Sequence, residues 1–185
     1  VLGNTFPDPA DFQMNQYTLT PFVLAPEQYD ANGNLVSRIT ATAQLQYGYD
    51  YCDRLVEVVN LASGLPELVA SYTYDAAGRR ISKTIYPSGL PPVTTEFVQD
   101  WRDDDCDGDI IEERVNGTLR RTYAFPHILE TKGRVMFTEG GETFYFHTDE
   151  AGNTLALTDA SGTVVERCDY DDYGMPIFLS TDGLP

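Results

Sequence analysis

The side chains most suggestive of chemistry lie in one acidic loop, residues 103–109, which reads Asp-Asp-Asp-Cys-Asp-Gly-Asp. Asp103, Asp105 and Asp107 are spaced like the first three ligands of an EF-hand loop, and Ca²⁺ prefers such carboxylate oxygens. The position of the closing bidentate glutamate is occupied by Arg114, however, and no helical pattern flanks the loop. We therefore expect no cofactor. The loop is an ordinary turn before a strand, or else a weak Ca²⁺ site of these three aspartates.

The histidines and cysteines form no recognisable reactive cluster. His127 and His147 lack a paired nucleophile and an orienting group, so the sequence predicts no enzyme. Cys52, Cys106 and Cys168 are too few and too widely spaced for structural zinc. A Cys52–Cys106 disulfide and three free thiols both stay open, because spacing alone does not supply the required geometry.

The tripeptide Asn116-Gly117-Thr118 is a glycosylation sequon that coincides with a turn signal. Asn-Gly between two strand-like runs, Ile110 to Val115 and Thr118 to Phe125, is typical of a two-residue hairpin turn. The turn explains the tripeptide without sugar, and glycosylation of Asn116 is the alternative.

Charge excludes two classes of partner. The chain has 185 residues with 29 Asp+Glu against 12 Lys+Arg, a formal net charge of −17. Such a surface repels the phosphates of nucleic acid and the headgroups of anionic membranes. No apolar run reaches the ~20 residues of a membrane span, and Val1 to Asn4 do not begin a signal peptide. We expect no membrane insertion, and a chain that is either processed or an excerpt of a longer one. Its length suits one domain, able to bury roughly 70% of its unfolded surface.

A Tyr-Asp repeat organises the chain. The intact copies are Tyr29-Asp30, Tyr49-Asp50, Tyr74-Asp75 and Tyr170-Asp171. Between the third and fourth lie three degenerate copies: Gln99-Asp100, Tyr123-Ala124 and Thr148-Asp149. The second positions fall at 30, 50, 75, 100, 124, 149 and 171, in steps of 20 to 25 residues. Glycine often follows three residues later. The motif residues are Tyr29, Asp30, Gly33, Tyr49, Asp50, Tyr74, Asp75, Gly78, Asp149, Gly152, Tyr170, Asp171 and Gly174.

Each part of this motif favours a strand, a tight turn and a second strand. Aromatic residues two apart, such as Tyr72 and Tyr74, share one face of a strand. The aspartate accepts hydrogen bonds from backbone amides ahead of it, and glycine supplies a positive φ. Cys168 replaces the first tyrosine of its copy, which favours a buried thiol. The sequence predicts an all-β fold of antiparallel hairpin repeats.

These residues resemble the YD-repeat family, also called the rearrangement-hotspot (RHS) family. Residues 29–35 (YDANGNL) resemble its repeat unit, and residues 15–18 (NQYT) resemble the opening of a repeat block. Residues 144–176 (FYFHTDEAGNTLALTDASGTVVERCDYDDYGMP) resemble the RHS-associated core. The resemblance implies four segments: 1–14, unassigned; 15–143, YD repeats; 144–178, core-like repeats; and 179–185, a tail.

The resemblance also implies a function. In the family, the repeats form a curved or spiralling β-sheet strip that closes into a shell. We therefore expect a non-catalytic part of a secreted or cell-surface bacterial scaffold or toxin-encapsulating shell. Its partners would be other copies or further repeats through the sheet edges, an enclosed toxin effector, or surface glycans. The alternative is a surface filament, or an adhesion or glycan-binding module, built by pairing of exposed sheet edges.

Overall fold

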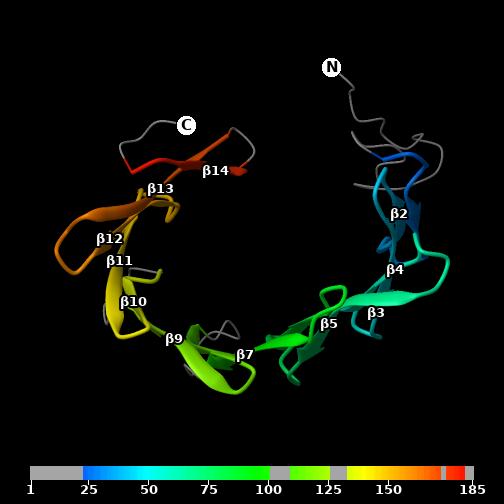
Figure 1. Cartoon of the computed structure of the whole chain (residues 1–185), viewed down its shortest axis with the longest axis horizontal. Helices are drawn as coiled ribbons and strands as arrows, with labels where there is room; N and C mark the ends of the chain where they lie inside the picture. Colours follow the sequence, from blue (N-terminus) through cyan, green and yellow to red (C-terminus); the bar gives the residue numbers. More distant parts are fainter. Residues whose placement is uncertain (1–22, 101–108, 126–132, 172–173, 182–185) are drawn as a thin grey trace. The chain divides into compact units, whose positions relative to one another are not determined.

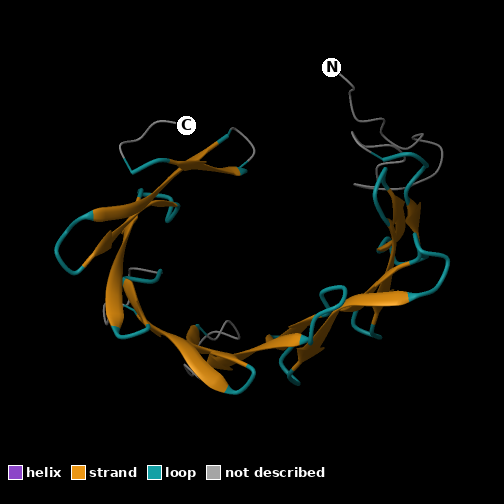
Figure 2. Ribbon diagram, viewed as in Figure 1, coloured by secondary structure: helices purple, strands orange, loops and turns teal. Residues whose placement is uncertain are grey.

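The computed structural model describes residues 23–100, 109–125, 133–171 and 174–181, and in them every regular element is a β-strand (Figure 2). No helix in these ranges has the length and hydropathy to cross a membrane. The strands are β1 (Gln28–Tyr29), β2 (Leu35–Ile39), β3 (Gln44–Tyr49), β4 (Leu55–Asn60), β5 (Glu67–Tyr74), β6 (Arg80–Ile85), β7 (Val93–Gln99), β8 (Ile110–Val115), β9 (Thr118–Ala124), β10 (Met136–Glu139), β11 (Glu142–Thr148), β12 (Thr154–Asp159), β13 (Val164–Tyr170) and β14 (Pro176–Leu179).

Strand order in the sheet follows chain order from β1 to β14, and neighbouring strands from β1 to β6 and from β8 to β14 are antiparallel (Figure 1). The all-β, antiparallel prediction is confirmed. The chain divides into two compact units, Val1–Thr95 and Glu96–Pro185, with the division inside β7. Within the described ranges, each strand contacts only the strands directly before and after it in the chain. Every contact between strands is therefore a contact between sequence neighbours.

The sequence period maps directly onto the strands. The seven second positions of the Tyr-Asp motif each lie at or directly after the last residue of an odd-numbered strand: β1, β3, β5, β7, β9, β11 and β13. One repeat is therefore two strands. The predicted Asn116-Gly117 hairpin joins β8 to β9, and both turn residues have positive φ, 49° and 78°. That pair of angles is the signature of a type I′ turn.

The first unit (Val1–Thr95) has one apolar face and one polar face. Cross-strand pairing places Tyr47, Val58, Ala70 and Ile85 in one row across β3 to β6. The opposite face carries hydroxyl pairs, such as Thr73 with Ser82 at 2.6 Å between their oxygens. This alternation follows from the two-residue period of a strand.

The core is much smaller than the chain length predicts. Among the described residues only Val58, Ala70 and Phe137 are buried hydrophobic side chains, and Glu27 is the one buried charged residue. The expectation of roughly 70% burial assumed a globular domain with packed layers. Here each strand lies beside its neighbours in one sheet, so one side of many apolar side chains faces solvent.

The second unit (Glu96–Pro185) is centred on Phe137 of β10. Its ring lies 5.0 Å from that of Phe144 and 5.5 Å from that of Phe146, both on the neighbouring β11, between ring centroids. Tyr123 of β9 lies 6.0 Å away on the other side. Arg121 covers Phe137 at 4.8 Å and forms an ion pair of 2.6 Å with Glu139. The aromatic residues of the motif therefore pack on one another here.

Candidate functional site

The candidate site is the series of turns that begin with a motif aspartate. In the Asp75 turn, Oδ1 accepts hydrogen bonds from the backbone N–H groups of Ala77 and Arg79, both at 2.9 Å. The N–H of Gly78 donates to the Asp75 carbonyl at 3.1 Å, and Gly78 has a φ of 86°. The backbone N–H of Asp75 donates to the Arg79 carbonyl at 2.9 Å. The aspartate thus accepts hydrogen bonds from backbone N–H groups that, because they lie in the turn, cannot pair with a neighbouring strand.

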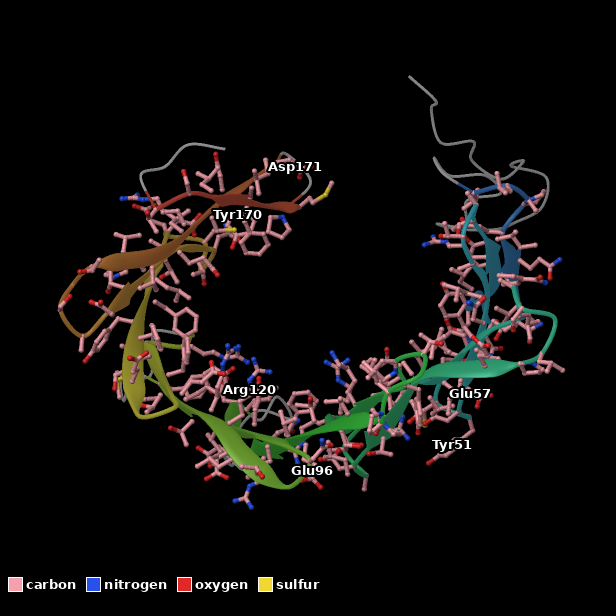
Figure 3. All side chains as sticks on the ribbon, viewed as in Figure 1. Tyr51, Glu57, Glu96, Arg120, Tyr170 and Asp171 are labelled. Carbon is pink, nitrogen blue, oxygen red and sulfur yellow. The ribbon has the colours of Figure 1, made fainter. Side chains whose placement is uncertain are left out.

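The same arrangement recurs along the chain. Asp30, Asp50, Asp149 and Asp159 each accept from the amides two and four residues ahead, at 2.8 to 3.0 Å. Asp171 accepts from the amide four residues ahead at 2.8 Å, and Figure 3 shows it beside Tyr170 at the end of β13. The turns therefore share one backbone geometry.

The second carboxylate oxygen of several turn aspartates binds the side chain four residues ahead. Arg54 Nε donates to Asp50 at 2.7 Å and Arg79 Nε to Asp75 at 2.8 Å. Asn34 and Asn153 fill this position in the turns of Asp30 and Asp149. These bonds stabilise the charged form of the carboxylate.

The pKa values of the turn aspartates are lowered as a result. The pKa of Asp50 is lowered chiefly by the Arg54 side chain, and that of Asp75 chiefly by the backbone N–H of Arg79. Side-chain donors four residues ahead, or two ahead in the last case, do the same for Asp30, Asp149 and Asp159. The folded pKa values therefore lie below the unfolded ones.

Acid should weaken these turns. Because the folded pKa is the lower one, the stability from each carboxylate is present above the unfolded value of about 3.9 and is lost as pH falls through the folded value. We expect the unfolding temperature to fall between pH 5 and pH 2 for the wild type, and to fall less for Asp75→Asn. Circular dichroism melts across this range measure both slopes. Equal slopes for the two proteins would contradict the assignment.

In three repeats, the tyrosine before the aspartate forms a hydrogen bond to the preceding repeat. Tyr49 Oη donates to the Leu35 carbonyl at 2.9 Å, and Tyr74 Oη to the Leu55 carbonyl at 2.8 Å. Tyr170 Oη donates to the Thr154 carbonyl at 2.9 Å. Each acceptor lies five residues after the preceding motif aspartate, beyond the paired positions of the backbone ladder. We call this bond the tyrosine rung.

Neighbouring turns of the first unit also contact each other directly. Asn32 Nδ2 and Asn34 Nδ2 both donate to Asp53 Oδ1 of the next turn at 2.8 Å. Arg54 of that turn donates to the Asp75 carbonyl at 3.2 Å and lies 4.9 Å above the Tyr74 ring centroid. The turns at Asp30, Asp50 and Asp75 therefore form a continuous polar series.

The tyrosine of the first described repeat has a carboxylate acceptor. Tyr29 Oη donates to a carboxylate oxygen of Glu27 at 3.4 Å. The Glu27 side chain is 1% exposed and forms an ion pair of 2.6 Å with Arg38. A buried carboxylate is tolerated where it is paired in this way.

The hairpin of β13 and β14 differs in register. The hairpins at Tyr29, Tyr49, Tyr74 and Thr148 shift register at or just before these residues, whereas β13 pairs with β14 without a shift. Cys168 is therefore opposite Phe178, which supplies the aromatic side chain that Cys168 lacks. The Cys168 thiol is half-buried rather than buried.

Several predicted site residues lie outside the described residues. They are Asp103, Asp105 and Asp107 of the acidic loop, together with Cys106 and His127. Calcium binding and the Cys52–Cys106 disulfide stay predictions, and Cys52 itself is exposed in the Asp50 turn. In the described ranges no group of three acidic, histidine or cysteine side chains is arranged to hold a metal ion.

The remaining predicted residues lie on the sheet. Asn116 is exposed in its turn, and its glycosylation stays a prediction. His147 Nε2 lies 2.9 Å from Thr158 Oγ1 on the neighbouring strand, a contact between two adjacent strand residues. Neither the surroundings of Asn116 nor the contact of His147 with Thr158 brings together a nucleophile, a base and an orienting group.

The run Asp159-Ala160-Ser161-Gly162 between two strand-like runs predicts a hairpin turn, and Asp159 forms the same turn as the motif aspartates although threonine precedes it. Sequence reasoning missed two contributors. Asp53 has a φ of 58° and takes the place of the motif glycine. Glu27 had no signal, because its role depends on the positions of Tyr29 and Arg38.

Comparison with known proteins identifies related sequences. Residues 29–65 match the family model described as RHS Repeat. The chain is 28% identical over 148 residues to the tRNA3(Ser)-specific nuclease WapA of Bacillus spizizenii, covering 80% of this chain and 6% of that protein. It is 27% identical over 173 residues to the toxin protein Tse5 of Pseudomonas aeruginosa, covering 79% of this chain and 13% of that protein. The chain thus spans a small part of the length of each relative.

Solved structures with some likeness include two described as TcdB2-TccC3-Cdc42 and TcdB2-TccC3-TEV. The first has a TM-score of 0.34 and 14% identity, covering 83% of this chain and 10% of that chain. The second has a TM-score of 0.35 and 15% identity, covering 94% of this chain and 8% of that chain.

Proposed function

Because this chain belongs to the RHS-repeat family, we propose that it is a non-catalytic structural segment of a larger bacterial scaffold or toxin-encapsulating shell. The observation that carries the proposal is the tyrosine rung, formed by Tyr49, Tyr74 and Tyr170. When each repeat is bonded only to the repeats next to it in the sequence, the sheet can be lengthened by adding repeats, as the wall of a shell requires.

The activities in the relatives' names belong, in this proposal, to other parts of those proteins. One relative is named a nuclease and the other a toxin, and this chain spans 6% and 13% of them. The net charge of −17 disfavours contact with a tRNA backbone. In this proposal, the effector of the larger protein is a partner of these repeats.

Secretion or display at the cell surface is part of the same proposal. The named relatives come from bacteria, and one is called a nuclease and the other a toxin, names that imply action on other molecules. An acidic surface keeps a sheet with many half-exposed aromatic residues in solution. Surface glycans are a further class of partner for the exposed aromatic side chains.

Tyr74→Phe tests the scaffold proposal, because it removes one rung hydroxyl and keeps the ring under Arg54. We expect a loss of about 1 kcal/mol in the free energy of unfolding, which is a fall of roughly 4–8 °C in the first unit. Tyr51→Phe is the control, since Tyr51 is 92% exposed and projects into solvent (Figure 3). Thermal melts measure both variants. If the two substitutions lower the unfolding temperature equally, the tyrosine rung does not stabilise the repeats, and the scaffold proposal loses its main support.

The same purified proteins test the absence of catalysis. Total tRNA incubated with wild-type chain should stay intact on a denaturing gel, and Tyr74→Phe should behave identically. Cleavage by the wild type that Tyr74→Phe retains would show an active site in these repeats and overturn the non-catalytic part of the proposal.

Self-assembly through sheet edges is the second candidate function. Met175, Ile177 and Phe178 are exposed apolar side chains at the edge strand β14. Edge strands with apolar side chains recruit other strands. A surface filament or an adhesion module would use this edge.

A further inference from the structure

We propose that Arg120, Arg121 and Arg134 of the second unit (Glu96–Pro185) form a binding site for a carboxylate ligand, which we call the arginine site. The ligand is a small carboxylic acid or an acidic side chain of a partner polypeptide, since both present the same group. These arginines take no part in the tyrosine rungs, so the site is independent of the scaffold function.

One carboxylate of the chain already lies between two of these arginines. Glu139 on β10 accepts a hydrogen bond from Arg120 Nε at 2.8 Å and one from Arg121 Nε at 2.6 Å, with one bond to each carboxylate oxygen. Arg121 is directly opposite Glu139 across β9 and β10, and Arg120, labelled in Figure 3, is its neighbour in the sequence. The two bonds use one of the five N–H donors of each guanidinium group. The spacing of the two arginines therefore suits a carboxylate.

Aromatic rings hold two of the guanidinium groups in place. Arg121 lies 4.8 Å from the ring centroid of Phe137, and Arg134 lies 4.4 Å from that of Tyr123. The two rings are neighbours, with their centroids 6.0 Å apart. A guanidinium group that is stacked on a ring has less freedom left to lose when it binds a ligand. The rings thus prepare both groups for binding.

The local charge is positive although the chain is acidic. The three guanidinium groups lie near two carboxylates, those of Glu139 and Glu113, and Glu113 accepts a hydrogen bond from Tyr123 Oη at 2.9 Å. One positive charge is therefore left over, in a chain with a net charge of −17. At 0.1 M salt the Debye length is about 10 Å, so more distant carboxylates repel a bound anion only weakly.

The donors and the charge together favour a carboxylate. A guanidinium group presents paired N–H donors that match the two oxygens of a carboxylate. The side chains of Arg120 and Arg121 are 50% and 31% exposed, and Arg134 is exposed, so a dissolved ligand can reach all three. One positive charge matches one carboxylate, whereas a phosphate monoester carries about −1.5 to −2 at pH 7.

Nitrogen-15 NMR of the full chain tests the site. Propionate is the small-molecule probe and the blocked tripeptide Gly-Glu-Gly is the polypeptide probe, with propionamide and blocked Gly-Gln-Gly as their neutral controls. We expect the Nε–H signals of Arg120, Arg121 and Arg134 to shift with both carboxylates and to stay unchanged with both amides. The probe that binds more tightly identifies the source of the carboxylate.

Arg134→Gln should weaken the binding of either probe about three- to fivefold, which is the effect expected of one exposed charged contact. Arg134→Lys should also weaken binding, because lysine keeps the charge but lacks the paired donors. Arg114→Gln is the matched control, since it removes the same charge in the same unit from a 46% exposed side chain paired with Glu112. Circular dichroism establishes that the variants are folded. If Arg134→Gln does not fold, Arg120→Gln replaces it.

Three results would overturn the arginine site. They are the absence of shifts with both carboxylates, equal shifts with the amides, and equal affinity of Arg134→Gln and Arg114→Gln for the probes. Tighter binding of inorganic phosphate than of propionate would overturn the assignment to carboxylates. The scaffold proposal is unaffected by these results, because Tyr74→Phe tests it separately in the first unit.

Discussion

Replacing Phe137 with alanine is expected to lower the free energy of unfolding of the second unit (Glu96–Pro185) by about 3–5 kcal/mol. Phe137 is 6% exposed, and its ring lies within 6.0 Å of those of Tyr123, Phe144 and Phe146. Among the described residues, no second layer of structure is available to collapse into the cavity. Since a small domain is stable by roughly 5–15 kcal/mol, this loss is a large part of the total.

Urea unfolding followed by hydrogen exchange measures the effect and locates it. Exchange should accelerate in β9 to β11 and change little in β2 to β6, because strands contact only their sequence neighbours. Phe137→Leu should lose less, since it keeps much of the apolar volume. Leu119→Ala is the control at a 53% exposed position. A loss below about 1 kcal/mol for Phe137→Ala would show that the ring cluster is not a core.

Ala70→Asp is expected to have a comparable effect in the first unit (Val1–Thr95). Ala70 is 3% exposed, with Val58 and Ile85 directly opposite it on the two neighbouring strands. A carboxyl group introduced between these two side chains has no cation opposite it in the row, and its burial costs roughly 4 kcal/mol.

Thr73→Asp is the matched control, because Thr73 is an exposed residue on the polar side of the same strand. We expect its effect to stay within about 0.5 kcal/mol. Urea unfolding compares the two variants. Equal destabilisation by both would mean that the row from Tyr47 to Ile85 is solvated, and that the two faces of the sheet do not differ.

The repeat spacing predicted most of the fold. Strand ends follow from the motif because a turn aspartate and a positive-φ residue are local requirements, written within five residues of each other. The Asn116-Gly117 hairpin is the clearest example, since both residues adopt the angles that a type I′ turn requires. Degenerate copies such as Thr148-Asp149 also mark strand ends, because the period survives the loss of the tyrosine.

The contacts between repeats could not be predicted in the same way. Each tyrosine rung joins residues 14, 16 or 19 positions apart, and that distance varies with loop length. The pairing of Cys168 with Phe178 depends on a missing register shift, which no residue type signals. The small core was likewise hidden, because composition reports how many apolar residues exist and not how many layers cover them.

The contacts between successive turns limit how the repeats can be exchanged in evolution or in design. Asn32 and Asn34 bind Asp53, and Arg54 contacts Tyr74, so each turn carries residues suited to the next one. A recombination event with its breakpoint between two consecutive turns separates the residues that contact each other across them. An event that moves two consecutive turns together keeps the contacts between those two turns. The heritable module of this part of the chain is therefore the junction between two repeats.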